Sequence, residues 1–127
     1  FVLLQPTTPF RTSSDIDKSC ELLLNSDIDS VVSVCNVGSM HPLRMKKITK
    51  NGSLVNYINQ DFENMKPRQE LPTVYIRNGA IYASKSIVLE KYKSLVGPDC
   101  AAHIMSSEQS INIDTILDFK LAELIIL

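Results

Sequence analysis

Apolar positions in the first third of the chain follow two different periods. Residues 1–4 and 30–35 are nearly continuous runs of apolar and β-branched residues, which is typical of buried strands. The apolar side chains between them recur at the spacing of one helix face, at Ile16, Cys20, Leu23 and Leu24. This helix is predicted to begin near Ser14 and to end near Asn25. The order of elements predicts a βαβ unit with two parallel strands.

The last half of the chain continues this alternation of short strands and helices. The predicted elements are a strand at 74–76, a strand at 80–83, a helix at 86–95, a strand at 101–105 and a helix from Asp114 with an apolar stripe of Leu117, Leu121, Leu124 and Ile125. Asp114 is a candidate N-cap, because its carboxylate can accept a hydrogen bond from a first-turn amide. Together the elements predict one α/β domain over residues 1–127, with a three-layer, mostly parallel sheet.

The segment from residue 41 to residue 67 is more polar than its flanks. Asn51-Gly52 lies between short apolar stretches, which is a hairpin signal and predicts arms at 46–48 and 53–55. A polar hairpin of this kind packs poorly on its own core. It is therefore interpreted as a lid, as an arm that contacts a partner subunit, or as a plain surface excursion.

Composition narrows the class of protein. The chain has 127 residues, of which 44% are hydrophobic and 21% charged, and this suits a globular domain. A net charge of −1 gives no basic surface for nucleic acid. No apolar run approaches the ~20 residues of a membrane span, and no signal-peptide pattern is present. The three cysteines form no Cys-x-x-Cys pair and are interpreted as reduced core thiols of a cytoplasmic protein.

Several kinds of catalytic site lack support in the sequence. There is no Gly-x-Ser-x-Gly motif and no glycine-rich phosphate loop, and His41 and His103 lie far apart. The loop at residues 5–9 is better placed, because ligands of open α/β sheets bind beyond the carboxyl ends of strands. Its glutamine and threonine side chains can hydrogen-bond a polyhydroxylated ligand. The alternative is a turn stiffened by Pro6 and Pro9.

Four segments, in order along nearly the whole chain, resemble one known family. Residues 3–11 resemble the family segment Leu-Leu-Gln-Pro-Thr-Ser-Pro-Leu-Arg. Residues 68–82 resemble its Arg-Gln-x-x-Pro…Tyr…Asn-Gly-Ala-Ile-Tyr, and residues 113–123 resemble its Asp-Ile-Asp-Thr…Asp-Phe…Ala-Glu tail. Together with His41-Pro42, these segments resemble the acylneuraminate cytidylyltransferases, also called CMP-sialic acid synthetases.

The resemblance implies a reaction and an architecture. CTP and an acidic nine-carbon keto sugar would give the CMP-sugar and pyrophosphate, with Mg²⁺ as cofactor. The enzyme would be a cytoplasmic homodimer of capsule or lipopolysaccharide synthesis. Its fold would be of the nucleotide-diphospho-sugar transferase type, with residues 41–67 as a dimerisation arm. The family's first strand and nucleotide loop would precede Phe1, so we expect the parent protein to be the enzyme and the chain alone to be inactive.

The resemblance also implies roles for individual residues. The substrate-binding candidates are Gln5, Thr8, Arg68, Gln69, Asn78 and Tyr82. Arg68 would bind a carboxylate or phosphate with its bidentate fork, and Asp114 would act in catalysis as a Mg²⁺ ligand. Four of these residues have a simpler alternative: a surface salt bridge for Arg68, packing for Tyr82, a tight turn for Asn78 and a helix cap for Asp114.

The chain departs from the family pattern at three positions within these segments. Asn112 stands where the family has a second aspartate, and it offers Mg²⁺ a neutral carbonyl instead of a charge, so metal binding should be weaker. Asn112 and Asp114 are two residues apart, so on an extended segment their side chains should point to the same side. Thr8 in place of serine and Phe10 in place of leucine are mild changes.

Two other functions are compatible with the sequence. The first is a non-catalytic, dimerising α/β remnant, which Asn112 favours. The second is a related cytidylyltransferase of 3-deoxy-octulosonate, which ranks lower because that family has Gln-Gly-Asp-Glu-Pro where this chain has residues 5–9. The choice among sialic, legionaminic and pseudaminic acids depends on pocket shape. Arg11 has no role that the sequence pattern explains.

Overall fold

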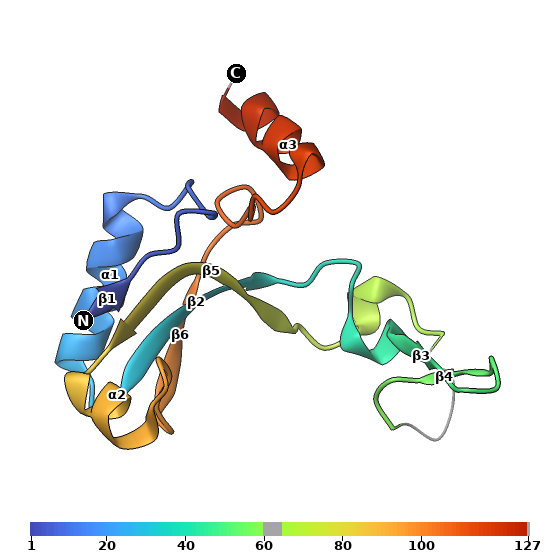
Figure 1. Cartoon of the computed structure of the whole chain (residues 1–127), viewed down its shortest axis with the longest axis horizontal. Coiled ribbons are helices and arrows are strands. Elements are labelled where there is room, and N and C mark those ends of the chain that lie inside the picture. The colour runs from blue at the N-terminus through green and yellow to red at the C-terminus, as the bar shows by residue number, and fades with distance from the viewer. Residues whose placement is uncertain (60–64, 127) are drawn as a thin grey trace. The chain divides into compact units, whose positions relative to one another are not determined.

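The computed structural model describes residues 1–59 and 65–126 and divides the chain into two compact units (Figure 1). The first unit combines Phe1–Cys35 with Ile76–Leu127, and the second is Asn36–Tyr75. The division falls inside two long strands, β2 (Ser30–Asn36) and β5 (Tyr75–Ser84), each of which has one end residue in the second unit.

A four-stranded sheet with three helices forms the first unit. Besides β2 and β5, its elements are β1 (Val2–Leu3), α1 (Ser13–Asn25), α2 (Ser86–Tyr92), β6 (Cys100–Ile104) and α3 (Ile116–Ile126). The strand order is β1-β5-β2-β6. β1 pairs antiparallel with β5, whereas β2 pairs parallel with β6. The unit is therefore an α/β fold with a mixed sheet.

The predicted mostly parallel sheet is wrong, and the reason lies in β5. Lys85 N–H donates to Asp29 O, and Ile81 N–H donates to the Ser33 hydroxyl oxygen, so β5 runs opposite to β2. β1 and β2 consequently run in the same direction, as the βαβ pattern predicts, but β5 lies between them. Hydrophobic periodicity reports that a segment is a strand and does not report which neighbours it takes.

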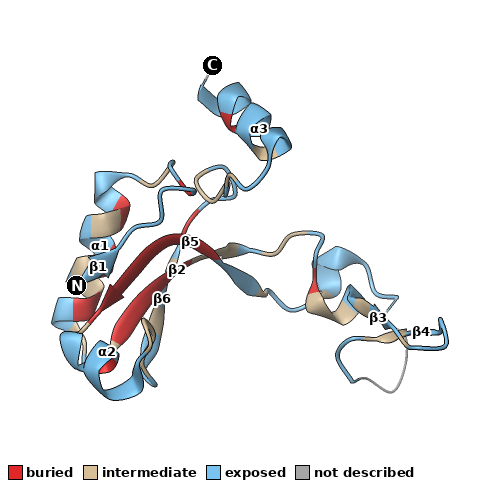
Figure 2. Cartoon of the chain, viewed as in Figure 1, coloured by how far each residue is buried: buried red, intermediate tan, exposed pale blue. Residues whose placement is uncertain are grey.

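Helix α1 covers one face of this sheet. Its buried residues are Asp15, Ser19 and Leu23, and Leu23 packs with Val31 and Ala83 of the sheet. Figure 2 shows that buried residues are concentrated on β2 and β5. Leu24, which was predicted to belong to the buried stripe, is 81% exposed.

The hydrogen bonds at the start of α1 explain why this helix buries Asp15 and leaves Leu24 exposed. Thr12 is the N-cap, and its hydroxyl oxygen accepts from Asp15 N–H while the Asp15 carboxylate accepts from Thr12 N–H at 2.8 Å. This reciprocal capping box begins the helix one residue before the predicted Ser14. It turns the polar Asp15 inward, where His103 Nε2 of β6 lies 3.2 Å from its carboxylate.

Four groups from three parts of the chain surround the Asp15 carboxylate. Thr12 donates through its N–H and its hydroxyl, Gln109 Nε2 donates at 3.1 Å, and His103 is the fourth contact. Burial raises the pKa of Asp15, but the hydrogen bonds from Thr12 and the contact with His103 outweigh it and lower the pKa overall. Asp15 therefore fixes the start of α1 against β6 and the segment that follows it.

We expect Asp15→Ala to lower the free energy of unfolding by about 2 kcal/mol near neutral pH, because it removes charge-assisted hydrogen bonds. A lowered folded-state pKa stabilises the fold above the ordinary value of 3.8, and this stabilisation is lost as pH falls through the lowered pKa. Urea unfolding at about pH 7 and about pH 2.5 should therefore show a smaller mutational effect in acid. Asp17→Ala, at an exposed position of α1, is the control, and equal losses for the two variants would contradict the role of Asp15.

The opposite face of the sheet is only partly covered by the described residues. Cys100, Ala102 and Ile104 alternate along β6 with the side chains that face α1, and all three are exposed. The three-layer arrangement therefore remains a prediction. Helix α3 is also largely exposed, and Ala122 is its buried residue. None of the described helices has the length and apolar character needed to cross a membrane.

The cysteines and the two histidines have structural surroundings. Cys20, Cys35 and Cys100 are free thiols, as predicted, but Cys100 is exposed and is no core residue. His41 is buried in the second unit, where Nε2 lies 3.0 Å from Pro72 O and Nδ1 accepts from Leu43 N–H. His103 contacts Asp15, so both side chains have structural partners.

The second unit contains the predicted hairpin. Its elements are η1 (Pro42–Arg44), β3 (Lys46–Ile48), β4 (Leu54–Asn56) and η2 (Arg68–Glu70). β3 and β4 pair antiparallel with Lys46 opposite Asn56 and Ile48 opposite Leu54. Gly52 has a φ of +82° in the connecting turn, which explains the glycine at this position. Part of the predicted arm, residues 60–64, lies outside the described residues.

Candidate functional site: a polar cleft at the bulge of β5

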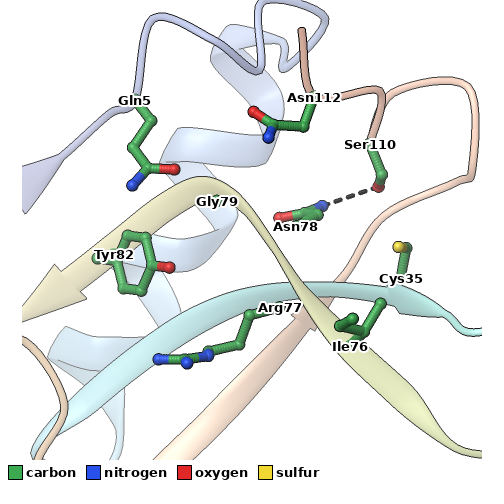
Figure 3. A pocket seen from close by; sticks show the side chains of 9 residues that line it. All are labelled: Gln5, Cys35, Ile76, Arg77, Asn78, Gly79, Tyr82, Ser110 and Asn112. Atoms are coloured by element: carbon green, nitrogen blue, oxygen red, sulfur yellow. Dashed lines mark hydrogen bonds between the residues drawn. The ribbon is translucent and has the colours of Figure 1, made fainter. Parts of the chain in front are cut away.

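A polar cleft of about 320 Å³ lies in the first unit, at the end of the sheet where β5 bends. It is lined by Gln5, Cys35, Ile76, Arg77, Asn78, Gly79, Tyr82, Ser110 and Asn112 (Figure 3). Its volume falls in the range of small-molecule sites. Four predicted site residues, Gln5, Asn78, Tyr82 and Asn112, thus come together from three distant segments of the chain.

The bend is a bulge in a continuous strand. Residues 74–76 and 80–83 were predicted as separate strands with a turn between them, but β5 runs without interruption through Tyr75–Ser84. Gly79 has a φ of +80° within this strand, and Asn78 Oδ1 accepts from Ala80 N–H at 3.1 Å. Gly79 does have the positive φ that the Asn-Gly turn signal predicted. The residues before and after it nevertheless both belong to β5, so the turn is part of the strand.

Asn78 is the centre of a buried hydrogen-bond network. Its Oδ1 accepts from the Ser33 hydroxyl at 2.6 Å, and its Nδ2 donates to Ser110 Oγ at 2.8 Å and to Met105 Sδ at 3.3 Å. Its backbone oxygen accepts from the Thr8 hydroxyl at 3.0 Å. The side chain is only 7% exposed. Its polar atoms therefore bind the protein, and Asn78 shapes the cleft floor instead of presenting free groups to a ligand.

The loop at residues 5–9 lies against the segment that contains Asn112. Ile113 N–H donates to Thr7 O at 2.7 Å, and the fully buried Thr8 hydroxyl lies 3.3 Å from Asn112 Oδ1. Thr8 therefore lies behind the cleft surface and positions Asn78 and Asn112. Its predicted contact with a sugar remains a prediction and would require this hydroxyl to become accessible.

Arg11 supports the same loop. Its guanidinium donates to the backbone oxygens of Gln5 at 2.8 Å and Thr8 at 2.6 Å. This double contact fixes the curvature of the loop that carries Gln5 into the cleft. It supplies a structural role that the sequence pattern did not explain.

Three polar side-chain ends in the cleft are free of hydrogen bonds and ion pairs within the described part of the chain. They are the Gln5 amide, the Tyr82 hydroxyl and the Arg77 guanidinium. Figure 3 shows the Tyr82 hydroxyl pointing into the hollow, with Gln5 on one side of it and Arg77 on the other. The sequence patterns did not single out Arg77, Ser110, Cys35 or Ile76. Arg77 carried a detectable signal, since it directly precedes the Asn78-Gly79 motif.

We expect Gly79→Ala to disturb the cleft through Gln5. A Cβ at position 79 would clash with Gln5 Oε1, and the φ of +80° adds a cost of about 1–2 kcal/mol for an L-residue. The Gln5 amide should move away from the cleft, because it is the flexible partner. NMR signals of that amide should shift, together with the loss in stability measured by urea unfolding.

Gly52→Ala is a matched control for this variant. Gly52 has a similar φ of +82°, but an added Cβ would meet no atom within 4 Å. It should show the same backbone cost and leave the Gln5 signals unchanged. Unshifted Gln5 signals in Gly79→Ala would contradict the steric coupling.

Asp114 is not the cap of the last helix, a role for which the sequence made it a candidate. Thr115 caps α3, because its hydroxyl oxygen accepts from Asp118 N–H at 3.3 Å and the Asp118 carboxylate accepts from Thr115 N–H at 2.7 Å. The Thr115 hydroxyl and N–H, with Asp114 N–H, lower the pKa of Asp118. The capping pair is one residue further along the chain than predicted, and this leaves the Asp114 carboxylate outside the cap.

Asp114 and Asn112 are adjacent and exposed, as their spacing predicts. Asn112 Nδ2 donates to Asp114 Oδ2, while Asn112 Oδ1 faces Thr8. The described residues contain no group of three metal-ligating side chains. One carboxylate and one amide are nevertheless a donor set that suits Mg²⁺ when water and substrate phosphates supply the other ligands. The amide would have to turn for both side chains to face one ion through oxygen.

Arg68 and Gln69 belong to the second unit. Both are exposed and lie in η2, between Pro67 and Leu71. The cleft is lined by residues of the first unit. The substrate-binding roles of Arg68 and Gln69 therefore remain predictions.

Known proteins similar to this chain point to one enzyme family, although no family model matches it. The N-acylneuraminate cytidylyltransferase of Streptococcus agalactiae serotype V is 34% identical over 119 residues, which cover 94% of this chain and 28% of that protein. That of Escherichia coli O18:K1:H7 is 32% identical over 123 residues, covering 96% of this chain and 28% of that protein. The chain is a homologue of the N-acylneuraminate cytidylyltransferases.

The similarity extends to a related synthase. The CMP-N,N'-diacetyllegionaminic acid synthase of Legionella pneumophila is 33% identical over 127 residues, which cover 96% of this chain and 51% of that protein. The chain thus spans between about a quarter and a half of the length of these relatives. The resemblance to N-acylneuraminate cytidylyltransferases that the motifs indicate is confirmed.

Proposed function

We propose that the protein is a nucleotidyltransferase that activates an acidic nine-carbon keto sugar with CTP and releases the CMP-sugar and pyrophosphate. The observation that carries this proposal is the convergence of family-like segments on one cleft. Gln5, the Asn78-Gly79 bulge and Asn112 come from three such segments and line the same hollow. The relatives' names, which include N-acylneuraminate and legionaminic acid enzymes, support this substrate class.

The chain's own residues bind and orient the sugar in this proposal. The Gln5 amide and the Tyr82 hydroxyl hydrogen-bond sugar hydroxyls, since both face the cleft without protein partners among the described residues. Asn78 and Thr8 hold the floor rigid through their mutual hydrogen bond. A rigid floor favours transfer, because the sugar's attacking hydroxyl must be held in line with the α-phosphorus of CTP. Arg68 and Gln69 are further candidate substrate contacts.

Mg²⁺ is the cofactor of this proposal, with Asp114 and Asn112 as its protein ligands. When bound, the ion would neutralise charge on the transferring phosphate. Asp114 offers the carboxylate, which takes no part in capping α3. Asn112 offers a neutral oxygen after rotation of its amide, so the site should hold the ion less tightly than a pair of aspartates.

Residues 41–67 act as a dimerisation arm in this proposal, within a fold of the nucleotide-diphospho-sugar transferase type. The antiparallel pairing of β3 and β4 supports the hairpin, and Leu54 and Ile48 expose apolar surface on it. Exposed apolar residues on a two-stranded hairpin are suited to burial against a second copy.

We expect replacement of residues 41–67 by a short Gly/Ser linker to convert a dimer into a monomer. The hairpin would no longer supply apolar surface for the interface. Sedimentation velocity should show about half the mass of the unmodified protein, while circular dichroism reports the retained helices. An unchanged oligomeric state in a folded variant would contradict the arm.

A turnover assay with CTP tests the function. The protein as encoded in its genome is incubated with CTP, Mg²⁺ and sialic, legionaminic or pseudaminic acid, and CMP-sugar and pyrophosphate are measured. Formation of both products with one of these acids supports the proposal, and their absence with every acid contradicts it.

A non-catalytic, dimerising module is the second candidate function. The hydrogen bond from Asn112 to Asp114 favours it, because this bond turns the amide nitrogen, and not its oxygen, toward the carboxylate. A protein that binds the sugar in the same assay mixture but forms no CMP-sugar would support this alternative.

A further inference from the structure

The buried hydroxyl group of Thr8 has more hydrogen-bonding capacity than the structure uses. Its oxygen lies 3.0 Å from Asn78 O and 3.3 Å from Asn112 Oδ1, and both of these neighbours are acceptors. A hydroxyl has a single hydrogen, so it cannot donate fully to both. The shorter distance assigns this hydrogen mainly to Asn78 O. The lone pairs of the Thr8 oxygen receive no hydrogen from any residue that the structure describes.

The other end of the Asn112 amide holds it in its present orientation. Nδ2 donates to the Asp114 carboxylate in a charge-assisted hydrogen bond, and this leaves Oδ1 facing Thr8. The backbone beside Asn112 is fixed, because Ile113 N–H donates to Thr7 O at 2.7 Å. Asn112 itself is exposed, and Figure 3 shows its side chain at the edge of the cleft. The amide can therefore rotate while the backbone stays in place.

Rotation of this amide by about 180° exchanges its oxygen and nitrogen, which have nearly the same size and position. The oxygen then lies beside the Asp114 carboxylate, and the N–H group lies beside the Thr8 oxygen, whose lone pairs can accept it. The Thr8 hydrogen remains with Asn78 O. The rotated form thus exchanges the hydrogen bond to Asp114 for one to Thr8. A cation at Asp114 favours this form, because it attracts the amide oxygen and repels the amide hydrogens.

We propose that Thr8 is a positioning residue for a divalent cation, because its hydroxyl oxygen accepts the Asn112 N–H when the amide oxygen turns toward a cation on Asp114. The inference rests on the proposed function for the metal ion and goes beyond it by naming the group that holds the ligating orientation. Without a cation, the amide N–H is bound to Asp114. With a cation, the same N–H is bound to Thr8, and both Asn112 and Asp114 present oxygen.

NMR of the genome-encoded protein, with MgCl₂ as the added ligand, tests this exchange directly. Without Mg²⁺, the Nδ2 hydrogens of Asn112 should show nuclear Overhauser effects to the Hβ atoms of Asp114. At saturating Mg²⁺ these effects should weaken, and effects to the Thr8 side chain should appear. Effects to Asp114 that persist unchanged at saturating Mg²⁺ overturn the proposal, and so do Asn112 and Asp114 signals that Mg²⁺ does not shift.

Variants of Thr8 provide a second measurement. Thr8→Val removes the hydroxyl and keeps the shape of the side chain, so it should weaken Mg²⁺ binding by about 3- to 10-fold, the effect of one ordinary hydrogen bond. Thr8→Ser keeps the hydroxyl and should bind Mg²⁺ as wild type does. The shift of the Asp114 amide signal with Mg²⁺ measures each affinity. Equal affinities for Thr8→Val and wild type contradict the positioning role.

Asn112→Asp supplies the background that separates positioning from structural support. A carboxylate has oxygens on both sides and no N–H group for Thr8 to accept. In this background Thr8→Val should therefore not weaken Mg²⁺ binding. A hydroxyl that only held the cleft floor through Asn78 would be missed equally in both backgrounds, so equal weakening overturns the proposal.

The same measurements separate this inference from the proposed function. CMP-sugar formation by a protein whose Asn112 amide does not exchange would refute the role of Thr8 alone. Amide exchange and Thr8-dependent Mg²⁺ binding without CMP-sugar formation would refute the enzyme alone.

Discussion

Asn78→Ala is expected to lower the free energy of unfolding by about 4 kcal/mol, more than either Asp15→Ala or Gly79→Ala. The variant removes the acceptor of the Ser33 hydroxyl and of Ala80 N–H, and it removes the donor to Ser110. Ser33 is fully buried, so in the variant its hydroxyl keeps only the longer hydrogen bond to Ile81 O at 3.2 Å, and the buried Ala80 N–H loses its acceptor. Unsatisfied buried groups cost about 1–3 kcal/mol each, and the truncated side chain leaves a cavity in addition.

Urea unfolding of two further variants makes this test specific. Asn25→Ala changes an exposed asparagine at the end of α1 and should cost only a few tenths of a kcal/mol. Asn78→Asp keeps the oxygen that accepts from Ser33 but loses the Nδ2 donor and brings a charge into a buried position, so it should also be strongly destabilised. A cost for Asn78→Ala as small as that of Asn25→Ala would contradict the central role of Asn78 in the buried network.

Asp114→Asn is expected to spare stability and to lower cytidylyl transfer by about a hundredfold at limiting Mg²⁺, because it removes a charge beside the transferring phosphate. The structure shows why this substitution should not change the stability of the fold. Thr115 and Asp118 cap α3, so the Asp114 carboxylate is not needed for the helix. Titration of activity with Mg²⁺ in the genome-encoded protein measures the shift in metal requirement.

Two neighbouring variants provide the comparison. Asn112→Asp should lower the Mg²⁺ requirement, since it adds a second hard anionic ligand beside the first. Asp118→Asn should weaken the capping box of α3 and leave the Mg²⁺ requirement unchanged. Superimposable Mg²⁺ curves for wild type, Asp114→Asn and Asn112→Asp would contradict the ligand role of both residues.

Local sequence signals predicted those features whose causes lie within a few residues. The hairpin formed where Asn51-Gly52 indicated it, because its turn depends on a glycine with positive φ. The strand at 30–35 was found because its β-branched run reflects burial. The motif segments identified the homologous family, since backbone turns and ligand contacts restrict residue types at fixed positions.

The starts of α1 and α3 were predicted at the wrong residues because two possible capping residues lie close together at each helix start. Ser14 and Asp114 are acceptable N-caps, but Thr12 and Thr115 each have an aspartate three residues later. The paired capping box supplies two hydrogen bonds where a single cap supplies one, so the box determines the first turn. This pattern was readable in the sequence, and it could have corrected both boundaries.

The sequence by itself determined the α/β class, most element positions and the family to which the cleft-forming segments are similar. Only the tertiary structure decided that β5 separates β1 from β2, that Asn78 is the centre of a buried network and that Arg77 is the cation in the cleft. These features depend on contacts between groups such as Ser33, Asn78 and Ser110, which are far apart in the chain. Periodicity and local motifs report the preferences of neighbouring residues, whereas the partners of a buried polar group are fixed by strand order and packing.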